Sequence, residues 1–284
     1  MKTSSFSIVV GNRACNMNCP FCVSKMTQTE MGDTEPNWYR FYIACDIAEK
    51  AADGLISVLL TGKGEPTLYP NQITTYLHKM GKRFPLVDLQ TNGLTIAKDP
   101  DMLKHLEIWR DLGLTLVCVS VADRHGDDSS RIMGGPDDYD YWEAVDKIKG
   151  LGLACRINCT MTRDGLDGLG EVWAMISKCK SKGVDQLTLR SVARPETSIS
   201  PEAAKWVDDN KPYADDECIY KFLSSSKELL RLPHGASIFD VDGQNVCVNN
   251  CLTQDTNPNN IRQIIFFPDG RISYDWCYPG ARIL

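Results

Sequence analysis

Residues 15–22 read CNMNCPFC, a C-x3-C-x2-C arrangement of cysteines near the start of the chain. Three thiolates at such spacing can hold three irons of a [4Fe–4S] cube, which leaves the fourth iron without a protein ligand. An open metal position is where a substrate or cosubstrate binds, as it is at a catalytic zinc. A cube with a structural or simple electron-transfer role normally has four protein ligands. We therefore predict a catalytic cluster site held by Cys15, Cys19 and Cys22.

Two other uses of these cysteines fit less well. Structural zinc needs four ligands, the next cysteine is the distant Cys45, and none of the four histidines has metal-ligand spacing with another. A disulfide framework is not expected in a chain of this length that starts without a secretory signal. The twelve cysteines instead indicate a reducing cytoplasm.

Composition narrows the class of protein. The 284 residues suit one barrel-sized domain with a small appendage, or two ordinary domains. A hydrophobic content of 43% and a charged content of 24% are typical of a soluble globular protein. The net charge of −6 gives no general basic field for nucleic acid, and no apolar run reaches membrane-spanning length. We expect a cytoplasmic protein with neither a membrane segment nor a general nucleic-acid surface.

Strand-like and helix-like segments alternate over the first two thirds of the chain. Strands are expected at 6–11, 55–60, 86–90, 114–121, 153–161 and 185–190, and helices at 37–53, 70–83, 99–112, 138–150 and 167–182. Six β-α repeats in this order predict a parallel sheet with right-handed crossovers. The fold class is therefore α/β, a partial (β/α)6 barrel with its chemistry at the C-terminal ends of the strands.

The pattern changes after residue 195. Helices are expected at 201–209 and 215–231, hairpins at 236–241 with 244–248 and at 261–267 with 271–275, and a loop at 252–260. We predict a barrel domain over residues 1–195 and a small C-terminal α+β cap over residues 196–284. The cap would pack on the open edge or the mouth of the barrel.

Polar motifs follow the predicted strands, where a barrel places its chemistry. Residues 61–68 read TGKGEPTL after the second strand, and residues 90–93 read QTNG after the third. Glycine lets the backbone approach a small polar group closely, whereas Asn-Gly alone is only a turn signal. The fourth strand ends near Ser120.

Charged residues in the last two barrel strands have two interpretations each. Arg156 and Asn158 share a face of the fifth strand, because side chains two residues apart point the same way. An unpaired charge inside a barrel is costly, so Arg156 either faces the interior with a partner or faces solvent. Arg190 and Arg194, at the sixth strand, suit an anionic carboxylate or phosphate. The alternative is surface solvation, which we favour for Arg194.

Taken together and in order, these motifs resemble the radical S-adenosylmethionine (radical SAM) enzymes over residues 6–195. In that family the open iron chelates SAM, and a reduced cube cleaves it to methionine and a 5′-deoxyadenosyl radical that abstracts a substrate hydrogen. The resemblance implies an oxygen-sensitive enzyme that needs a low-potential electron donor such as a flavodoxin or ferredoxin. The implied contacts to SAM or substrate are Phe21, near the adenine, and Gly64, Glu65, Asn92, Ser120, Asn158 and Arg190.

The branch most similar in pattern is the GTP cyclase of molybdenum-cofactor biosynthesis, whose Lys-Ile-Asn pattern resembles residues 156–158. Lys63 replaces the first glycine of the family's GGEP motif, and Ile8 and Leu60 stand where that cyclase has GTP-binding arginines. The chain also ends without a Gly-Gly tail. We therefore take the architecture and the SAM site from the resemblance, and not the substrate.

The C-terminal cysteines leave three interpretations open. Cys247, Cys251 and Cys277, with Cys218, could bind a second iron–sulfur cluster, although their spacing departs from that of the cyclase. They could instead be small buried hydrophobic residues, the usual role of free cysteine. In the third interpretation one of them, with Cys277 the first candidate, donates a hydrogen atom to a substrate radical.

Three functions follow from the sequence. The first is an enzyme acting on a small molecule, with a nucleotide-like substrate included, because the barrel is compact and basic residues lie near its mouth. The second is an enzyme that modifies or epimerises a ribosomally made peptide. Such an enzyme usually has a leader-binding module, for which the short N-terminus leaves no room, although a separate protein could supply one. The third is a noncatalytic iron–sulfur protein, against which the SAM-site motifs argue.

Overall fold

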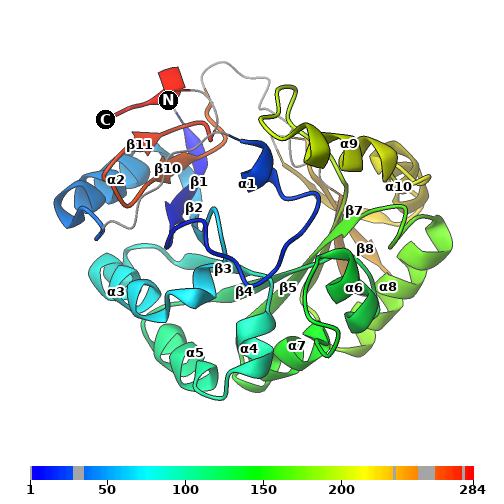
Figure 1. Ribbon diagram of the computed structural model, residues 1–284. Helices are drawn as coiled ribbons and strands as arrows, with labels where there is room; N and C mark the ends of the chain where they lie inside the picture. Colours follow the sequence, from blue (N-terminus) through cyan, green and yellow to red (C-terminus); the bar gives the residue numbers. More distant parts are fainter. Residues whose placement is uncertain (1, 28–34, 233–234, 249–259, 277–278) are drawn as a thin grey trace.

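A single curved sheet organises the molecule, and helices line its outer side (Figure 1). The structure is a computed structural model that describes residues 2–27, 35–232, 235–248, 260–276 and 279–284. Within these residues the strand order is β11-β10-β1-β2-β3-β4-β5-β6-β9-β8-β7. The strands are β1 (Thr3–Val9), β2 (Ala52–Thr61), β3 (Leu86–Thr91), β4 (Leu116–Val121), β5 (Ala154–Met161), β6 (Gln186–Ser191), β7 (Lys227–Arg231), β8 (Ser237–Val241), β9 (Gln244–Val248), β10 (Ile264–Phe266) and β11 (Ile272–Ser273).

The helices connect these strands in the expected alternating order. They are α1 (Val23–Met26), α2 (Trp38–Ala51), α3 (Pro70–Met80), α4 (Leu94–Lys98), α5 (Met102–Asp111), α6 (Gly126–Ile132), α7 (Tyr141–Gly150), α8 (Leu169–Ser181), α9 (Pro201–Asp209) and α10 (Asp216–Leu223), with short 3-10 turns at Pro66–Leu68, Gly81–Arg83 and Pro279–Ala281. No helix among the described residues has the length and apolar character needed to span a bilayer.

Strands β1 to β6 are parallel and lie in sequence order, and the sheet that contains them does not close on itself, which confirms the predicted partial barrel. Side chains alternate between the two faces of each strand. On β4, Val117 and Val119 are fully buried in the core that the helices cover, whereas Ser120 on the opposite face is partly exposed. The same alternation on β5 and β6 leaves the inner face of the sheet partly accessible.

The C-terminal hairpins extend the sheet at both of its edges. Strand β9 pairs in parallel with β6 and carries β8 and then β7, while β10 pairs in parallel with β1 and carries β11. The turn between β8 and β9 places Asp242 at a φ of 51°, next to Gly243. Both hairpins were expected from their Asp-Gly turns. The sequence left open whether they pack on the edge or on the mouth of the barrel, and the strands lie at the edges.

The helix expected over 215–231 is wrong in its second half. Helix α10 ends at Leu223, and Lys227–Arg231 form the edge strand β7. The hydroxyl of Ser224 donates to the carbonyl of Lys221 at 2.6 Å, and the next serine bonds its own preceding turn in the same way. Serine side chains that satisfy these last carbonyls end a helix, because they replace the bonds that a further turn would make.

Two short helices lie where the sequence indicated turns or loops. Helix α4 begins directly after Gly93, whose φ of 79° permits the turn, and it ends before residue 99, where the helix that α5 represents was expected to begin. Helix α6 lies in the polar segment that precedes α7. Both are too short to give a clear hydrophobic period.

Candidate functional site

The three cysteines of the first motif lie on the loop between β1 and α1, which Figure 1 shows inside the ring of helices. Lys25 fixes this loop from within: its Nζ donates to the carbonyls of Asn18 at 3.1 Å and Cys19 at 2.8 Å, and to the Asn18 side chain at 2.6 Å. The amide of Cys22 donates to the carbonyl of Cys19 at 3.3 Å. A single lysine thus holds the turn that carries the second and third thiols.

All three thiols are free, and Cys15 is exposed while Cys19 and Cys22 are half-buried. Burial, together with the smaller effects of the neighbouring thiols Cys22 and Cys15, raises the pKa of Cys19 to about 12. The three sulfurs are therefore close enough to influence one another electrostatically. Such a thiol deprotonates when a metal takes the place of its proton.

The donor set can be compared with two kinds of metal centre. Across the described part of the chain, no three His, Cys, Asp or Glu side chains are placed as ligands of one metal ion. In a [4Fe–4S] cube each thiolate binds a different iron, so its ligands do not converge on one point. Three free thiols on one loop fit the cube.

Gly64, after β2, lies directly against the cysteine loop. A Cβ added there would be 2.0 Å from the carbonyl oxygen of Ala14, a contact that no other residue type could make. The amide of the next residue, Glu65, donates to that same carbonyl at 2.9 Å. The glycine is therefore required for the loop after β2 to dock onto the loop that carries the thiols.

The Glu65 carboxylate is buried and joins the loops after β2 and β3. Its Oε1 accepts from the amide and hydroxyl of Thr67 at 3.0 and 2.7 Å and from the hydroxyl of Thr91 at 2.7 Å. Its Oε2 accepts from the amide of Asn92 at 2.9 Å. Burial raises the pKa of Glu65, and the four donors oppose that shift. Both oxygens are thus engaged within the protein.

Asn92 connects the turn after β3 to the first cysteine. Its Nδ2 donates to Asn16 Oδ1 at 2.7 Å and lies 3.8 Å from Cys15 Sγ. Its Oδ1 accepts from the amide of Leu94 at 3.0 Å. On the other side, the hydroxyl of Tyr139 donates to the Asn92 carbonyl at 2.7 Å. The sequence had placed Asn92 near SAM or substrate, and here it also contacts the thiol loop.

Ser120 and Asn158 lie side by side on the inner face, because they are register partners in β4 and β5. Thr188 of β6 follows next to Asn158. Asn158 is only 9% exposed, and its Oδ1 has no hydrogen-bond partner among the described residues. A buried carbonyl oxygen without a donor is unusual in a folded protein and marks a place where a ligand can donate to it.

Arg156 faces the interior, which decides between the two orientations that the sequence left open. Its guanidinium forms an ion pair with Asp88 of β3 and donates through Nε to Cys118 Sγ at 3.3 Å. Burial raises the pKa of Asp88. Arg156 opposes this shift and lowers the pKa, and the Gln90 side chain lowers it more weakly. Asp88 Oδ1 keeps no hydrogen-bond partner among the described residues.

The two other arginines differ from each other. Arg190 is partly exposed on the inner face, in register with Thr160, and makes no ion pair with any residue that the structure describes. Arg194 lies beyond β6 and pairs with Asp208 of α9 at 2.8 Å. Arg190 remains available to an anionic ligand, whereas Arg194 forms a surface ion pair in place of the solvation by water that the sequence favoured.

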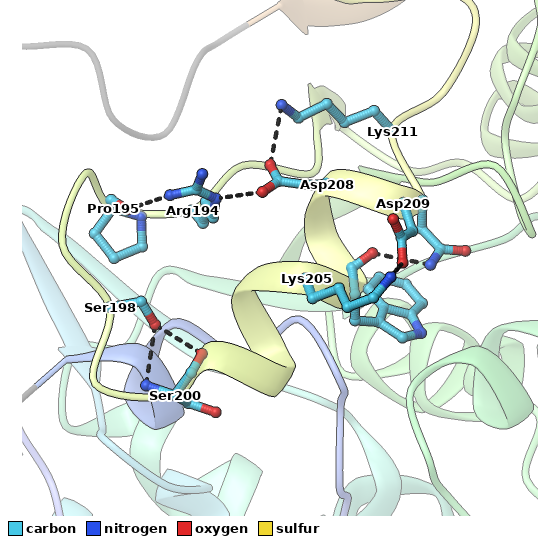
Figure 2. Close-up of polar contacts among 10 residues, drawn as sticks. Arg194, Pro195, Ser198, Ser200, Lys205, Asp208, Asp209 and Lys211 are labelled. Carbon is cyan, nitrogen blue, oxygen red and sulfur yellow. Dashed lines mark hydrogen bonds and ion pairs between the residues drawn. The ribbon is translucent and has the colours of Figure 1, made fainter.

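Phe21 packs against α9 rather than lying unpaired in the loop. Its ring is 5.5 Å from that of Trp206, and Met26 joins Val207 in the small apolar cluster between α1 and α9. Figure 2 shows how the segment before α9 is held: Ser198 bonds the backbone of Ser200. Also drawn there are the ion pairs Arg194–Asp208, Lys211–Asp208 and Lys205–Asp209.

The remaining cysteines give no second centre within the described residues. Cys247 is buried on β9 in register with Thr188, and Cys218 is half-buried on α10. Cys251 and Cys277 lie outside the described residues, so the second cluster and the hydrogen donor stay predictions. Sequence reasoning missed Asp88, Lys25 and Trp206, because their partners are known only from the fold.

A cavity of about 520 Å³ lies beside α7 and α8. It is lined by residues of the segment after β4, of α7 and of α8, including His125, Trp142 and Lys178. The amide groups and thiols described above do not contribute to it. The cavity is therefore not formed by the thiol loop, although Tyr139, which lines it, bonds the carbonyl of Asn92.

Comparison with known proteins agrees with this geometry. The family model of the radical SAM superfamily matches residues 9–172. SuiB of Streptococcus suis, solved with S-adenosylmethionine bound, has a TM-score of 0.62 at 12% identity, over 96% of this chain and 60% of that one. Native anSMEcpe with bound AdoMet gives 0.64 at 15% identity, over 98% and 77% of the two chains.

A third structure, of the [FeFe]-hydrogenase maturase HydG, has a TM-score of 0.55 at 15% identity, over 78% of this chain and 48% of HydG. At these identities the likenesses show the fold, an α/β partial barrel. The chain spans 60% of the length of SuiB. No curated protein sequence matches the chain.

Proposed function

Because the chain belongs to the radical SAM superfamily, whose members are enzymes, we propose that it cleaves SAM reductively and uses the resulting radical on a polar substrate. Cys15, Cys19 and Cys22 would hold the [4Fe–4S] cube. When bound, the cube and SAM supply a 5′-deoxyadenosyl radical that abstracts a hydrogen atom. The protein's part is to hold, orient and shield these groups.

The observation that carries this proposal is the convergence of the thiol loop with the turns after β2 and β3. Gly64 is in contact range of Ala14, and Asn92 reaches Cys15. Three motifs far apart in the sequence thus meet at the C-terminal ends of parallel strands, where a barrel of this kind does its chemistry. We assign Gly64 and the backbone beside it to the amino group of SAM, and Ser120, Asn158 and Arg190 to its polar groups.

The Glu65 side chain receives a different role from the one that the resemblance implies. Its two oxygens are already engaged by Thr67, Thr91 and Asn92. We therefore propose that the Glu65 carboxylate does not contact SAM directly. It holds in place the loop that binds SAM. Phe21 would stay near the adenine with Trp206 behind its ring.

We propose that the substrate is a small molecule that binds on the inner face below the SAM site. The opposite charges of Asp88 and Arg156 compensate each other in this region. An arginine that is already paired offers little to a triphosphate, so the pair argues against a nucleotide bound through Arg156. The unpartnered oxygen of Asp88 favours a substrate that donates hydrogen bonds.

A ribosomally made peptide is the second candidate. Structures of SuiB bound to precursor peptide SuiA and of anSMEcpe bound to Kp18Cys peptide have TM-scores of 0.59 and 0.60. A peptide also brings hydrogen-bond donors through its amides. In either case we propose that a flavodoxin or ferredoxin supplies the electron.

Anaerobic reconstitution with iron, sulfide, dithionite and SAM tests the proposal. We expect 5′-deoxyadenosine from the wild-type protein and from Cys179→Ala, whose thiol lies on α8, and none above background from Cys19→Ala. Iron and sulfide are measured on all three samples. A wild-type protein that binds a cube and forms no more 5′-deoxyadenosine than Cys19→Ala would contradict the proposed activity.

A further inference from the structure

We infer that the Asn92 side chain sets the reduction potential of the cluster by donating a hydrogen bond to the Cys15 sulfur. The inference rests on the proposed function, because it requires a cube at the three thiols. It gives Asn92 a role that differs from contact with SAM. Asn92 acts through the cysteine and is thus a positioning and tuning residue rather than a catalytic one.

The orientation of the Asn92 amide is fixed by its neighbours. A backbone N–H can only donate, so the amide of Leu94 at 3.0 Å requires Oδ1 on its side. Nδ2 must then point the other way, toward the loop of thiols. One of its hydrogens bonds Asn16 Oδ1 at 2.7 Å, and the other is free for Cys15 Sγ at 3.8 Å.

The surrounding contacts keep Asn92 in this place. The backbone N–H of Asn92 donates to Glu65 Oε2 at 2.9 Å, and the Tyr139 hydroxyl donates to the backbone carbonyl of Asn92 at 2.7 Å. Asn16 is itself tied down, since its Nδ2 donates to Thr95 Oγ1 at 3.1 Å. Asn92 is only 7% exposed. The donor is therefore preorganised and largely shielded from water.

The sign of the effect follows from charge. Reduction adds an electron to the cube and makes its thiolate sulfurs more negative, so an N–H donor stabilises the reduced state more than the oxidised one. Removing the donor lowers the reduction potential. Placing a carboxylate at the same position lowers it further, because a negative charge then faces the sulfur.

Two variants of Asn92 separate this effect from a structural one. Asn92→Asp keeps an oxygen for the Leu94 amide and loses the donor, whereas Asn92→Leu loses both. We expect the ratio of reduced to oxidised cluster at a fixed potential to fall about tenfold in Asn92→Leu, which corresponds to about 59 mV for one electron. Asn92→Asp should fall further. The same two changes at Asn71, exposed on α3, serve as controls and should leave the potential unchanged.

The experiment is a redox titration of the reconstituted cluster, followed by electron paramagnetic resonance. Iron, sulfide and the spectrum of the wild-type protein are measured first, so that absence of a cube counts against the proposed function alone. A wild-type cube with equal potentials in both Asn92 variants would overturn the inference and leave the function standing. An equal shift in the Asn71 variants would overturn it as well.

A measurement on the wild-type protein applies even if the variants fail to retain iron. Asparagine labelled with ¹⁵N at its side-chain amide is incorporated, and the reduced cluster is examined by pulsed electron paramagnetic resonance. We expect a hyperfine coupling to the amide nitrogen of Asn92, transmitted through its bond to Cys15. Asn16→Ala, which frees that amide from its second partner, should keep the coupling. Absence of coupling in the wild-type protein would contradict the inference.

Discussion

Replacing Arg156 by methionine tests the ion pair on the inner face of the sheet. Methionine keeps much of the apolar stem and removes the guanidinium, so Asp88 loses its partner. The side chains of Arg156 and Asp88 are 23% and 9% exposed, which places the pair among the buried ones. Removing one partner of a buried pair leaves an uncompensated charge, which costs about 3–5 kcal/mol of unfolding free energy.

We expect a loss of about 3 kcal/mol for Arg156→Met, at the low end of that range, because the arginine retains some contact with solvent. Asp88→Leu alone should cost a similar amount, since Arg156 then keeps only its contact with Cys118. The double variant should lie within about 1 kcal/mol of the wild-type protein, because replacing both charges by apolar groups is often neutral. The coupling energy is the difference between the double variant and the sum of the singles.

Urea unfolding of the metal-free protein, followed by circular dichroism, measures these free energies under reducing conditions. Lys180→Met is the matched control, because Lys180 pairs with Asp242 at the surface and its loss should produce no measurable change. Additive effects of Arg156→Met and Asp88→Leu, within about 0.5 kcal/mol, would refute the reasoning. Such additivity would mean that the two side chains do not compensate each other.

The other predictions concern the thiol loop and pH. Gly64→Ala should retain much less iron after reconstitution than Gly150→Ala, where the added carbon meets no atom within 4 Å; equal iron contents would count against close docking of the loops. Lys25→Met should release iron faster to a chelator, because three hydrogen bonds of the loop are lost; an unchanged rate would contradict the role given to it. In Arg156→Met the pKa of Asp88 should rise further, so the folded state binds a proton that the unfolded state lacks, and stability should increase as the pH falls from neutral toward the ordinary pKa of aspartate. A stability loss that grows over this range, measured by urea unfolding, would show the opposite sign.

Local signals in the sequence predicted the parts of the site that lie on one loop. Cys15, Cys19 and Cys22 share a short segment, so their spacing alone indicates the centre. The turns that contain Gly64 and Asn92 follow strands whose period is clear. Parallel strands bring their C-terminal ends together, and the meeting of these turns was therefore expected.

Contacts between distant strands could not be read from the sequence. Arg156 and Asp88 are 68 positions apart on β5 and β3, and either face of a strand could have carried the arginine. The Asp-Gly turns predict the two C-terminal hairpins but do not indicate which edge of the sheet each hairpin joins. The strand at Lys227–Arg231 was mistaken for helix, because its pattern is ambiguous and the serines before it decide the outcome.

The central claim is that SAM binds the cluster directly at an iron without a protein ligand. The most direct measurement is electron–nuclear double resonance on the reduced cluster with SAM labelled with ¹⁵N at the amino group of its methionine. A hyperfine coupling from that nitrogen, absent without SAM, is the result that the account predicts. A reduced cube whose spectrum is unchanged by saturating SAM would contradict it.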